Sequence, residues 1–277
     1  MTLRKQLEIA RLKLAALPAA ELEAEILLAH ALESPRSFLY ANPEIDLPSQ
    51  RIDLFRRLVR RRAGGEPIAY ITGHREFWSL RLRVTPDVLI PRHETELLVE
   101  SALQRLAVSE RQRVADIGTG SGAIALAIAS ERPACEVHAT DISPAAVALA
   151  TENAQSHGLG NVRFHQGSWC DPLSGQFSLV VSNPPYIGQG DPHLSQGDLR
   201  FEPELALTPG HDALSALQVI AEQAAACLLP GGILMFEHGT EQASGISEIL
   251  LQAGYTNIET LQDLAGLERV TLGSLSS

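Results

Sequence analysis

The sequence predicts an α/β protein in which a doubly wound, mostly parallel seven-stranded sheet follows a small helical N-terminal domain. From residue 114 onward, apolar stretches typical of strands alternate with stretches typical of helices. This alternation indicates a parallel sheet with right-handed crossovers. Before residue 73, apolar side chains instead recur every three or four positions, which is typical of helices. The length of 277 residues accommodates one large domain and one small domain.

The N-terminal region is predicted to form three helices. The first two carry an apolar stripe on either side of Pro18, made by Leu3, Leu7, Ala10, Leu14, Leu17, Leu22, Ile26 and Ala29. The third helix has an apolar face formed by Ile52, Phe55 and Val59. Elsewhere around that helix lie four arginines, Arg56, Arg57, Arg60 and Arg61. We expect these arginines to form a solvated helix face, with a surface for docking a partner as the alternative.

A hairpin is expected to join the helical region to the sheet. Its two short strands are predicted at 76–78 and 80–84, and the next helix begins near Glu94. These elements divide the chain into a helical domain, a β-hairpin linker and a catalytic domain, with the expected bounds 1–72, 73–92 and 93–277.

Seven strands are predicted in the catalytic domain, at Val114–Ile117, Glu136–Ile142, Val162–His165, Phe177–Ser182, Gly232–Glu237, Asn257–Leu261 and Arg269–Leu272. Helices are expected between them, including Ala123–Ser130, Pro144–His157 and Ala213–Leu228. The segment 262–268 is too short for a helical crossover, so the last two strands are predicted to pair antiparallel. In a doubly wound sheet the fourth strand lies beside the first.

Composition excludes several classes of protein. No apolar run of about 18 residues is present, so no membrane span is expected, and the charged N-terminus differs from a signal peptide. The three cysteines are scattered and the nine histidines form no cluster, which predicts a cytoplasmic protein without a metal site. Residues 1–85 carry 14 Lys and Arg against 10 Asp and Glu, whereas residues 86–277 carry 8 against 23. The acidic catalytic half counts against a nucleic-acid substrate.

A glycine-rich loop follows the first predicted strand of the sheet. It comprises Gly118, Thr119, Gly120, Ser121 and Gly122, directly after Asp116 and Ile117. Such a loop lets the backbone approach a ligand closely. Asp141 ends the second strand, where a carboxylate accepts hydrogen bonds from ribose hydroxyls. The pattern also satisfies a loosened dinucleotide motif, and glycines that serve only a tight turn remain an alternative. Asp116 favours S-adenosylmethionine because it repels a pyrophosphate but attracts a cationic amino group.

The fourth predicted strand runs into Asn183-Pro184-Pro185-Tyr186. A simple proline turn is one interpretation of this tetrapeptide. The residue types favour a catalytic role, because an sp2 nitrogen is a poor nucleophile and must be aligned before it can attack a methyl group. The Asn183 side-chain oxygen and the Pro184 carbonyl can accept the two N–H groups of a planar amide or amine, and Tyr186 can stack on it. Alignment of this kind lowers a barrier by up to about 7–11 kcal/mol, so the motif predicts methyl transfer to nitrogen.

These residues resemble the protein glutamine N5-methyltransferases that modify class 1 peptide chain release factors. The resemblance covers nearly the whole chain. Its markers, besides the glycine loop and Asn183–Tyr186, are Arg75-Glu76-Phe77-Trp78, Ile90-Pro91-Arg92, Arg200-Phe201-Glu202-Pro203 and Glu268-Arg269-Val270-Thr271-Leu272-Gly273. It implies a class I methyltransferase (Rossmann-like) sheet with an N-terminal domain that recognises the substrate.

The resemblance also implies the site. S-adenosylmethionine, which leaves as S-adenosylhomocysteine, is expected against Asp116, Gly118–Gly122, Asp141, Trp169 and Asn183. The substrate is the glutamine of a Gly-Gly-Gln motif in the release factor, expected against Asn183, Pro184, Pro185 and Tyr186. A cytoplasmic monomer without membrane contact or stable nucleic-acid binding is expected.

The chain departs from the family pattern at two places, with Ser168 in place of an acidic residue and His93 in place of a proline. Three other functions stay open on the residues alone. An adenine-N6 methyltransferase presents the same NH2 geometry to the tetrapeptide but predicts a basic groove. A non-catalytic nucleoside-binding or scaffold protein has no need of an asparagine at Asn183. A dinucleotide oxidoreductase ranks below both.

Overall fold

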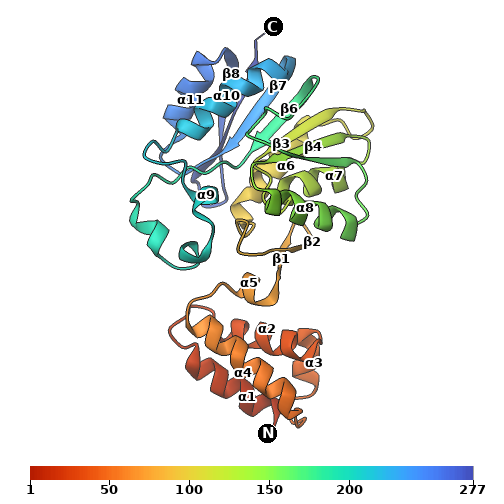
Figure 1. The fold of residues 1–277 in the computed structure, drawn as a ribbon, viewed down its shortest axis with the longest axis vertical. Helices are drawn as coiled ribbons and strands as arrows, with labels where there is room; N and C mark the ends of the chain where they lie inside the picture. Colours follow the sequence, from red (N-terminus) through yellow and green to blue (C-terminus); the bar gives the residue numbers. More distant parts are fainter. Residues whose placement is uncertain (277) are drawn as a thin grey trace. The chain divides into compact units, whose positions relative to one another are not determined.

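The computed structural model describes residues 1–276, which form two compact units, residues 1–74 and residues 75–276 (Figure 1). The first unit is helical, as predicted. Its helices are α1 Leu3–Lys13, α2 Ala20–Leu32, α3 Arg36–Ala41, α4 Ser49–Ala63 and α5 Ile68–Thr72. The three predicted helices correspond to α1, α2 and α4. The short α3 and α5 were not predicted, because five or six residues are too few to display a helical period.

The core of the first unit lies between α1, α2 and α4. Leu27, Leu28 and Phe55 are almost completely buried there. Helix α1 ends at Lys13, before the end of the predicted stripe, yet Leu14 and Leu17 still pack on the same core. The apolar pattern therefore predicts the buried face better than it predicts the end of the helix.

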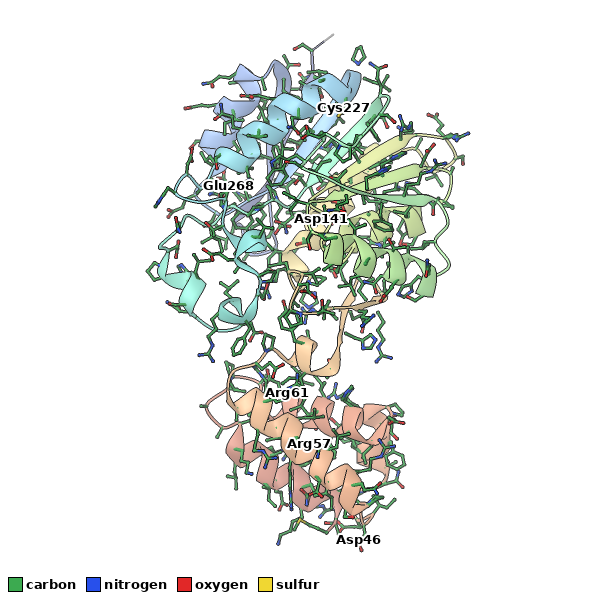
Figure 2. The ribbon with its side chains drawn as sticks, viewed as in Figure 1. Asp46, Arg57, Arg61, Asp141, Cys227 and Glu268 are labelled. Carbon is green, nitrogen blue, oxygen red and sulfur yellow. The ribbon has the colours of Figure 1, made fainter. Side chains whose placement is uncertain are left out.

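The arginine-rich helix α4 has an exposed face, as expected. Arg57, Arg60 and Arg61 are exposed, and Figure 2 labels Arg57 and Arg61 on this helix. The neighbouring Arg62 is buried instead, and its Nε donates to Glu23 at 2.7 Å. That pair joins α4 to α2 inside the first unit.

The second unit is built on one seven-stranded sheet. Its strands lie in the order β5-β4-β3-β6-β7-β9-β8, with β3 Arg113–Ile117, β4 Glu136–Asp141, β5 Val162–Gln166, β6 Phe177–Ser182, β7 Leu228–Glu237, β8 Tyr255–Gln262 and β9 Glu268–Leu275. The pairing of β6 with β3 is parallel, whereas β9 pairs antiparallel with both β7 and β8. The predicted sheet and its antiparallel end are confirmed. The strand order reverses between β3 and β6, where such sheets bind ligands.

Helices cover both faces of this sheet (Figure 1). Val114 of β3 packs in one core with α6 Glu96–Arg105, α7 Ala123–Glu131 and α8 Pro144–Ser156. The next residue, Ala115, points to the other core, with α10 Ser215–Cys227 and α11 Ala243–Gln252. This alternation is the pleat of a strand that is buried on both sides. The helix predicted near Glu94 begins at Glu96, after a 3-10 turn at His93–Thr95.

The predicted hairpin is formed by β1 His74–Phe77 and β2 Leu80–Arg83. Asn153 of α8 binds its second strand. The Asn153 Oδ1 accepts from the Arg83 amide at 2.8 Å, and Nδ2 donates to the Arg83 carbonyl at 3.0 Å and to the Ser121 carbonyl at 2.9 Å. One buried side chain therefore joins the hairpin to the glycine-rich loop.

Shorter elements complete the second unit, namely η2 Pro192–Ser195, η3 Leu199–Phe201 and α9 Glu204–Leu207. Among residues 1–276, none of the helices combines the length and the apolar character that a membrane span requires.

Replacing Asn153 by alanine is expected to destabilise the second unit. The change removes three hydrogen bonds and leaves their backbone partners unpaired, so the free energy of unfolding should fall by about 2–4 kcal/mol. Chemical denaturation of the purified variant measures this. The control is Gln155→Ala, an exposed position on the same helix. Equal stability of the two variants would contradict the role assigned to Asn153.

Candidate active site

A cavity of about 590 Å³ opens at the carboxyl ends of β3, β4 and β6. Its volume lies in the range of small-molecule sites. Eight of the predicted site residues line it, namely Gly118, Thr119, Gly120, Ser121, Asp141, Trp169, Asn183 and Pro185. Four others, Asp116, Gly122, Pro184 and Tyr186, are not part of its lining. The predicted residues thus come together, with eight on the wall and four close to these in the chain.

The glycine-rich loop is held in place by the neighbouring strand. The amides of Gly118 and Thr119 both donate to the Thr140 carbonyl at 2.9 Å. Gly120 has a φ of +57°, and a Cβ there meets no atom within 4 Å, so the loop presents bare backbone to the cavity. A Cβ added at Gly122 would lie only 3.1 Å from Leu126 and 3.2 Å from Ala150. Gly122 therefore allows close packing of α7 against α8.

Asp141 stands at the end of β4 and is labelled in Figure 2. Its Oδ2 accepts the Gly120 amide at 2.8 Å, and its Oδ1 accepts the Ser143 amide at 2.9 Å. Burial nevertheless raises the pKa of this carboxyl above its ordinary value. Each carboxylate oxygen has a second lone pair, so Asp141 can still accept two hydroxyl groups from a ligand.

Asp116 lies below the loop and is completely buried. Its Oδ2 accepts the Thr119 hydroxyl at 2.6 Å and the Ala125 amide at 3.1 Å. Among residues 1–276, its Oδ1 has no hydrogen-bond partner. Burial raises the pKa of this carboxyl to about 7. An unsatisfied carboxylate oxygen behind a cavity wall attracts a cationic group, because a positive charge offsets the cost of its burial.

Trp169 lines the cavity and directly follows Ser168, which also lines it. The indole Cζ3 lies 4.0 Å from the position of a Cβ on Gly118. Its backbone has a φ of +44°, a conformation that is rare for a bulky residue. The next residue secures this conformation, since the Cys170 amide donates to Gln223 Oε1 at 2.9 Å.

Asn183 directly follows β6 and lines the cavity. Its Nδ2 donates to the Thr95 hydroxyl at 3.3 Å. Within the described chain, its Oδ1 accepts no hydrogen bond, so an acceptor is available for a ligand N–H. Tyr186 is fixed beyond the turn, where its carbonyl accepts from Gln242 Nε2 at 2.9 Å and its ring approaches Gly239. Burial raises the pKa of the Tyr186 phenol, so it stays neutral.

Two sequence markers that lie far apart in the chain meet beside the cavity. Arg92 Nη2 pairs with Glu202 Oε1 at 2.5 Å, and the Ile90 amide approaches Glu202 Oε2 at 3.4 Å. The Glu202 side chain is fully buried, which raises its pKa although Arg92 opposes the shift. Because Pro91, Arg92 and Pro203 line the cavity, this ion pair holds two segments of its wall together.

Three residues of this region were not predicted as site residues. Glu202 belonged to a recognised marker, but the sequence did not show its partner. Thr95 and Glu237 could have been found only from weaker signs in the sequence. Thr95 is a hydroxyl residue just before a helix, and Glu237 is a carboxylate at the end of an apolar strand. His93 is exposed, as expected for a loop histidine. Among residues 1–276, no group of three or more His, Cys, Asp or Glu side chains is arranged to hold a metal ion.

Comparison with known proteins relates this geometry to a family. Residues 6–73 match the PrmC N-terminal domain, and residues 93–196 match the methyltransferase small domain. The chain is 52% identical to a release factor glutamine methyltransferase of Xylella fastidiosa (strain Temecula1), over 91% of this chain and 92% of that protein. The chain belongs to the release factor glutamine methyltransferase family. The relative from Escherichia coli (strain K12) is 48% identical, over 91% of each chain.

The fold agrees with this membership. The crystal structure of a methyltransferase from Pyrococcus furiosus matches with a TM-score of 0.56 at 17% identity, over 79% of this chain and 98% of that one. At this identity the likeness concerns the fold, which is the class I methyltransferase sheet predicted above.

Asp116 is expected to make stability depend on pH. Its folded pKa of about 7 lies above the ordinary value of 3.8, so protonation favours the folded state. This contribution is complete below pH 3.8 and is lost as the pH rises through 7. Between pH 5.5 and 8, Asp116→Asn should therefore gain about 2 kcal/mol in unfolding free energy relative to the unchanged protein.

Denaturation of both proteins at the two pH values measures the difference. Asp53→Asn, which changes an exposed carboxylate, serves as the control. A difference between Asp116→Asn and the unchanged protein that does not vary with pH would show that the carboxyl is ionised throughout.

Proposed function

We propose that this protein transfers a methyl group from S-adenosylmethionine to the side-chain amide nitrogen (N5) of the glutamine in the Gly-Gly-Gln motif of class 1 release factors. Membership of the family supports the reaction and its substrate. The observation that carries the proposal is the free Oδ1 of Asn183 on the wall of a cavity of suitable size. That atom is an acceptor for an amide N–H, placed at the switch point of the sheet.

The residues around the cavity fit S-adenosylmethionine. We assign the ribose hydroxyls to Asp141, the adenine to Trp169 and the cationic amino group to Asp116 with its unpartnered Oδ1. The loop Gly118–Gly122 approaches the methionine portion, since Gly120 leaves open space in front of its backbone. Asn183, at the end of β6, completes the cofactor contacts.

The target amide is assigned to Asn183–Tyr186. Asn183 Oδ1 accepts one N–H of the glutamine side chain and the Pro184 carbonyl accepts the other. Pro185 forms part of the wall beside them. Proline at 184 stiffens its own carbonyl because its φ is restricted. We assign to the buried Tyr186 a contact with the planar amide through its ring.

Alignment is the chemical task of this site. When bound, S-adenosylmethionine supplies a methyl group on a positively charged sulfur. The amide nitrogen is a weak nucleophile, since its lone pair is delocalised into the carbonyl. Two neutral acceptors hold the NH2 group so that the out-of-plane density of nitrogen faces the methyl group. Positioning of this kind supplies up to about 7–11 kcal/mol. The nitrogen takes the methyl group as the methyl–sulfur bond breaks, and one N–H proton then passes to water, so no strong base is needed before attack.

Charge supports a protein substrate over a nucleic acid. The half of the chain that contains the cavity is strongly acidic, while phosphate recognition depends on basic surfaces. We therefore propose no stable nucleic-acid binding, and place adenine-N6 methylation second. Residues 1–72 are proposed to recognise the release factor, with the exposed arginines of α4 as one contact. We propose that the protein acts as a monomer in the cytoplasm.

Radiolabelled S-adenosylmethionine tests the reaction. With purified release factor the unchanged protein should transfer label, whereas a Gln→Ala substitution in the Gly-Gly-Gln motif should abolish labelling. Asn183→Ala should lower turnover by at least about 100-fold, because the amide loses an acceptor that aligns it. Cofactor affinity should change much less than turnover, because Asn183 contacts the substrate more than the cofactor and the assigned contacts of Asp116, Asp141 and Trp169 remain. Label in bulk DNA but not in release factor would overturn the proposal.

Asp141→Ala is expected to weaken S-adenosylmethionine binding. Loss of two hydrogen bonds to a charged acceptor should raise the dissociation constant about 10–100-fold. Isothermal titration calorimetry of the purified variant measures this constant. Asp171→Ala, an exposed change on the loop after Trp169, is the control. An unaltered dissociation constant in Asp141→Ala would show that the ribose does not bind to Asp141.

A further inference from the structure

A buried carboxyl group stands directly behind Asn183. Glu237 is the last residue of β7, the strand that pairs in parallel with β6, and the registered pair Ser182 and Phe236 places Glu237 level with Asn183. Glu237 is 2% exposed. The side chains of Thr95 and Asn183 lie within hydrogen-bonding reach of its carboxyl. Three polar side chains thus form one cluster, which we call the Glu237 cluster: Glu237 at the end of β7, Asn183 directly after β6 and Thr95 in the turn before α6.

The burial of Glu237 is costly for the fold. Within residues 1–276 its Oε2 has no hydrogen-bond partner, and no cation forms an ion pair with it. The charge of Arg269 partly opposes the rise in the Glu237 pKa. The Arg269 Nε donates to Asp263 at 3.1 Å. Burial raises the pKa of Glu237 to about 7, while nearby Glu94 also disfavours its ionised form. Groups buried at such a cost are concentrated at functional sites.

The hydroxyl of Thr95 explains what the carboxyl does. A hydroxyl has one proton to donate. Thr95 Oγ1 accepts from Asn183 Nδ2, so its own proton must go to a different acceptor. Glu237 is an acceptor within reach. Without it, the Thr95 proton is free to turn toward Asn183, and the Asn183 amide can then flip. A flipped amide presents NH2 where the substrate N–H needs an oxygen.

We propose that Glu237 is a positioning residue that acts together with Thr95 to keep the Asn183 side-chain oxygen directed at the substrate amide. The inference rests on the proposed function, since it concerns the same reacting nitrogen. Glu237 does not line the cavity, so it touches neither substrate nor cofactor. Its effect is on the direction of the hydrogen bonds in this cluster: the Asn183 amide donates to Thr95, and both side chains lie within reach of the Glu237 carboxyl.

Two substitutions at Glu237 separate positioning from a role in folding. Glu237→Met has a similar volume but no strong acceptor, whereas Glu237→Gln keeps an acceptor oxygen. Turnover on saturating release factor and S-adenosylmethionine should fall at least about 10-fold in the Met variant and return to near the original value in the Gln variant. The thermal midpoint of Glu237→Met should be unchanged or higher, because an unsatisfied buried carboxyl has been removed. Cofactor affinity should change less than about twofold.

Thr95 provides a matched pair of variants. Thr95→Val removes the hydroxyl and should reproduce the Glu237→Met loss, while Thr95→Ser keeps it and should restore turnover. The double variant Glu237→Met/Thr95→Val should be no slower than the slower single variant, since both changes break one hydrogen-bonded cluster. Should Glu237→Met fail to fold, the two Thr95 variants decide the question. Glu248→Gln, an exposed change on α11, is the control.

Several outcomes overturn the inference. Unchanged turnover in Glu237→Met excludes positioning, and so does a loss that only follows a lower folded fraction. Fully additive losses in the double variant show that the two residues act separately. If the unchanged protein transfers no methyl group to release factor, the proposed function fails first. If it does, and Glu237→Met matches it, only the inference about Glu237 fails.

Discussion

The parallel pairing of β3 with β6 is the constraint on which the site depends. It places Ile117 opposite Ser182, and the Ser182 hydroxyl donates to the Ile117 carbonyl at 2.7 Å. Because the two strands end level, the glycine-rich loop and Asn183 start from the same edge of the sheet. If β6 shifted by one residue along β3, its side chains would change faces, and Ser182 and Ile117 would no longer share one face of the sheet. The distance between the proposed cofactor and the target nitrogen is thus determined by backbone hydrogen bonds.

Among the carboxyl groups around this edge are the buried Asp116 and Glu237 and the half-buried Asp141. Burial raises the pKa of each, and their surroundings differ in how they offset it. Asp141 receives two backbone amides, Asp116 receives a hydroxyl and an amide, and Glu237 shares only a hydroxyl and a side-chain amide. The unpartnered oxygens, Asp116 Oδ1 and Glu237 Oε2, lower the stability of the fold. Such costs are found where a protein holds a ligand or a reacting group.

Much of this arrangement could be predicted from the sequence. The seven strands, the place of the fourth beside the first and the antiparallel pair at the end followed from alternation, from the doubly wound topology and from the length of the connections. The glycine-rich loop, Asp141 and Asn183 followed from short motifs whose residues are neighbours in the chain. The links Asn183–Thr95 and Arg92–Glu202 could not be predicted, because each joins residues about 90 or more positions apart. Gly122 was predicted from the motif to contact the cofactor. In the structure it does not line the cavity but lets Ala150 pack closely against the loop.

The order of the last three strands has a consequence for the synthesis of the chain. β9 lies between β7 and β8, and the His238 amide, next to Glu237, donates to the Arg269 carbonyl at 3.0 Å. Until residues 268–275 leave the ribosome, β7 is an unpaired edge of the sheet. The cofactor loops and Asn183 can therefore be made long before the wall behind them is complete. Pairing of β9 with β7 is therefore the step that completes the sheet behind Asn183 and Glu237.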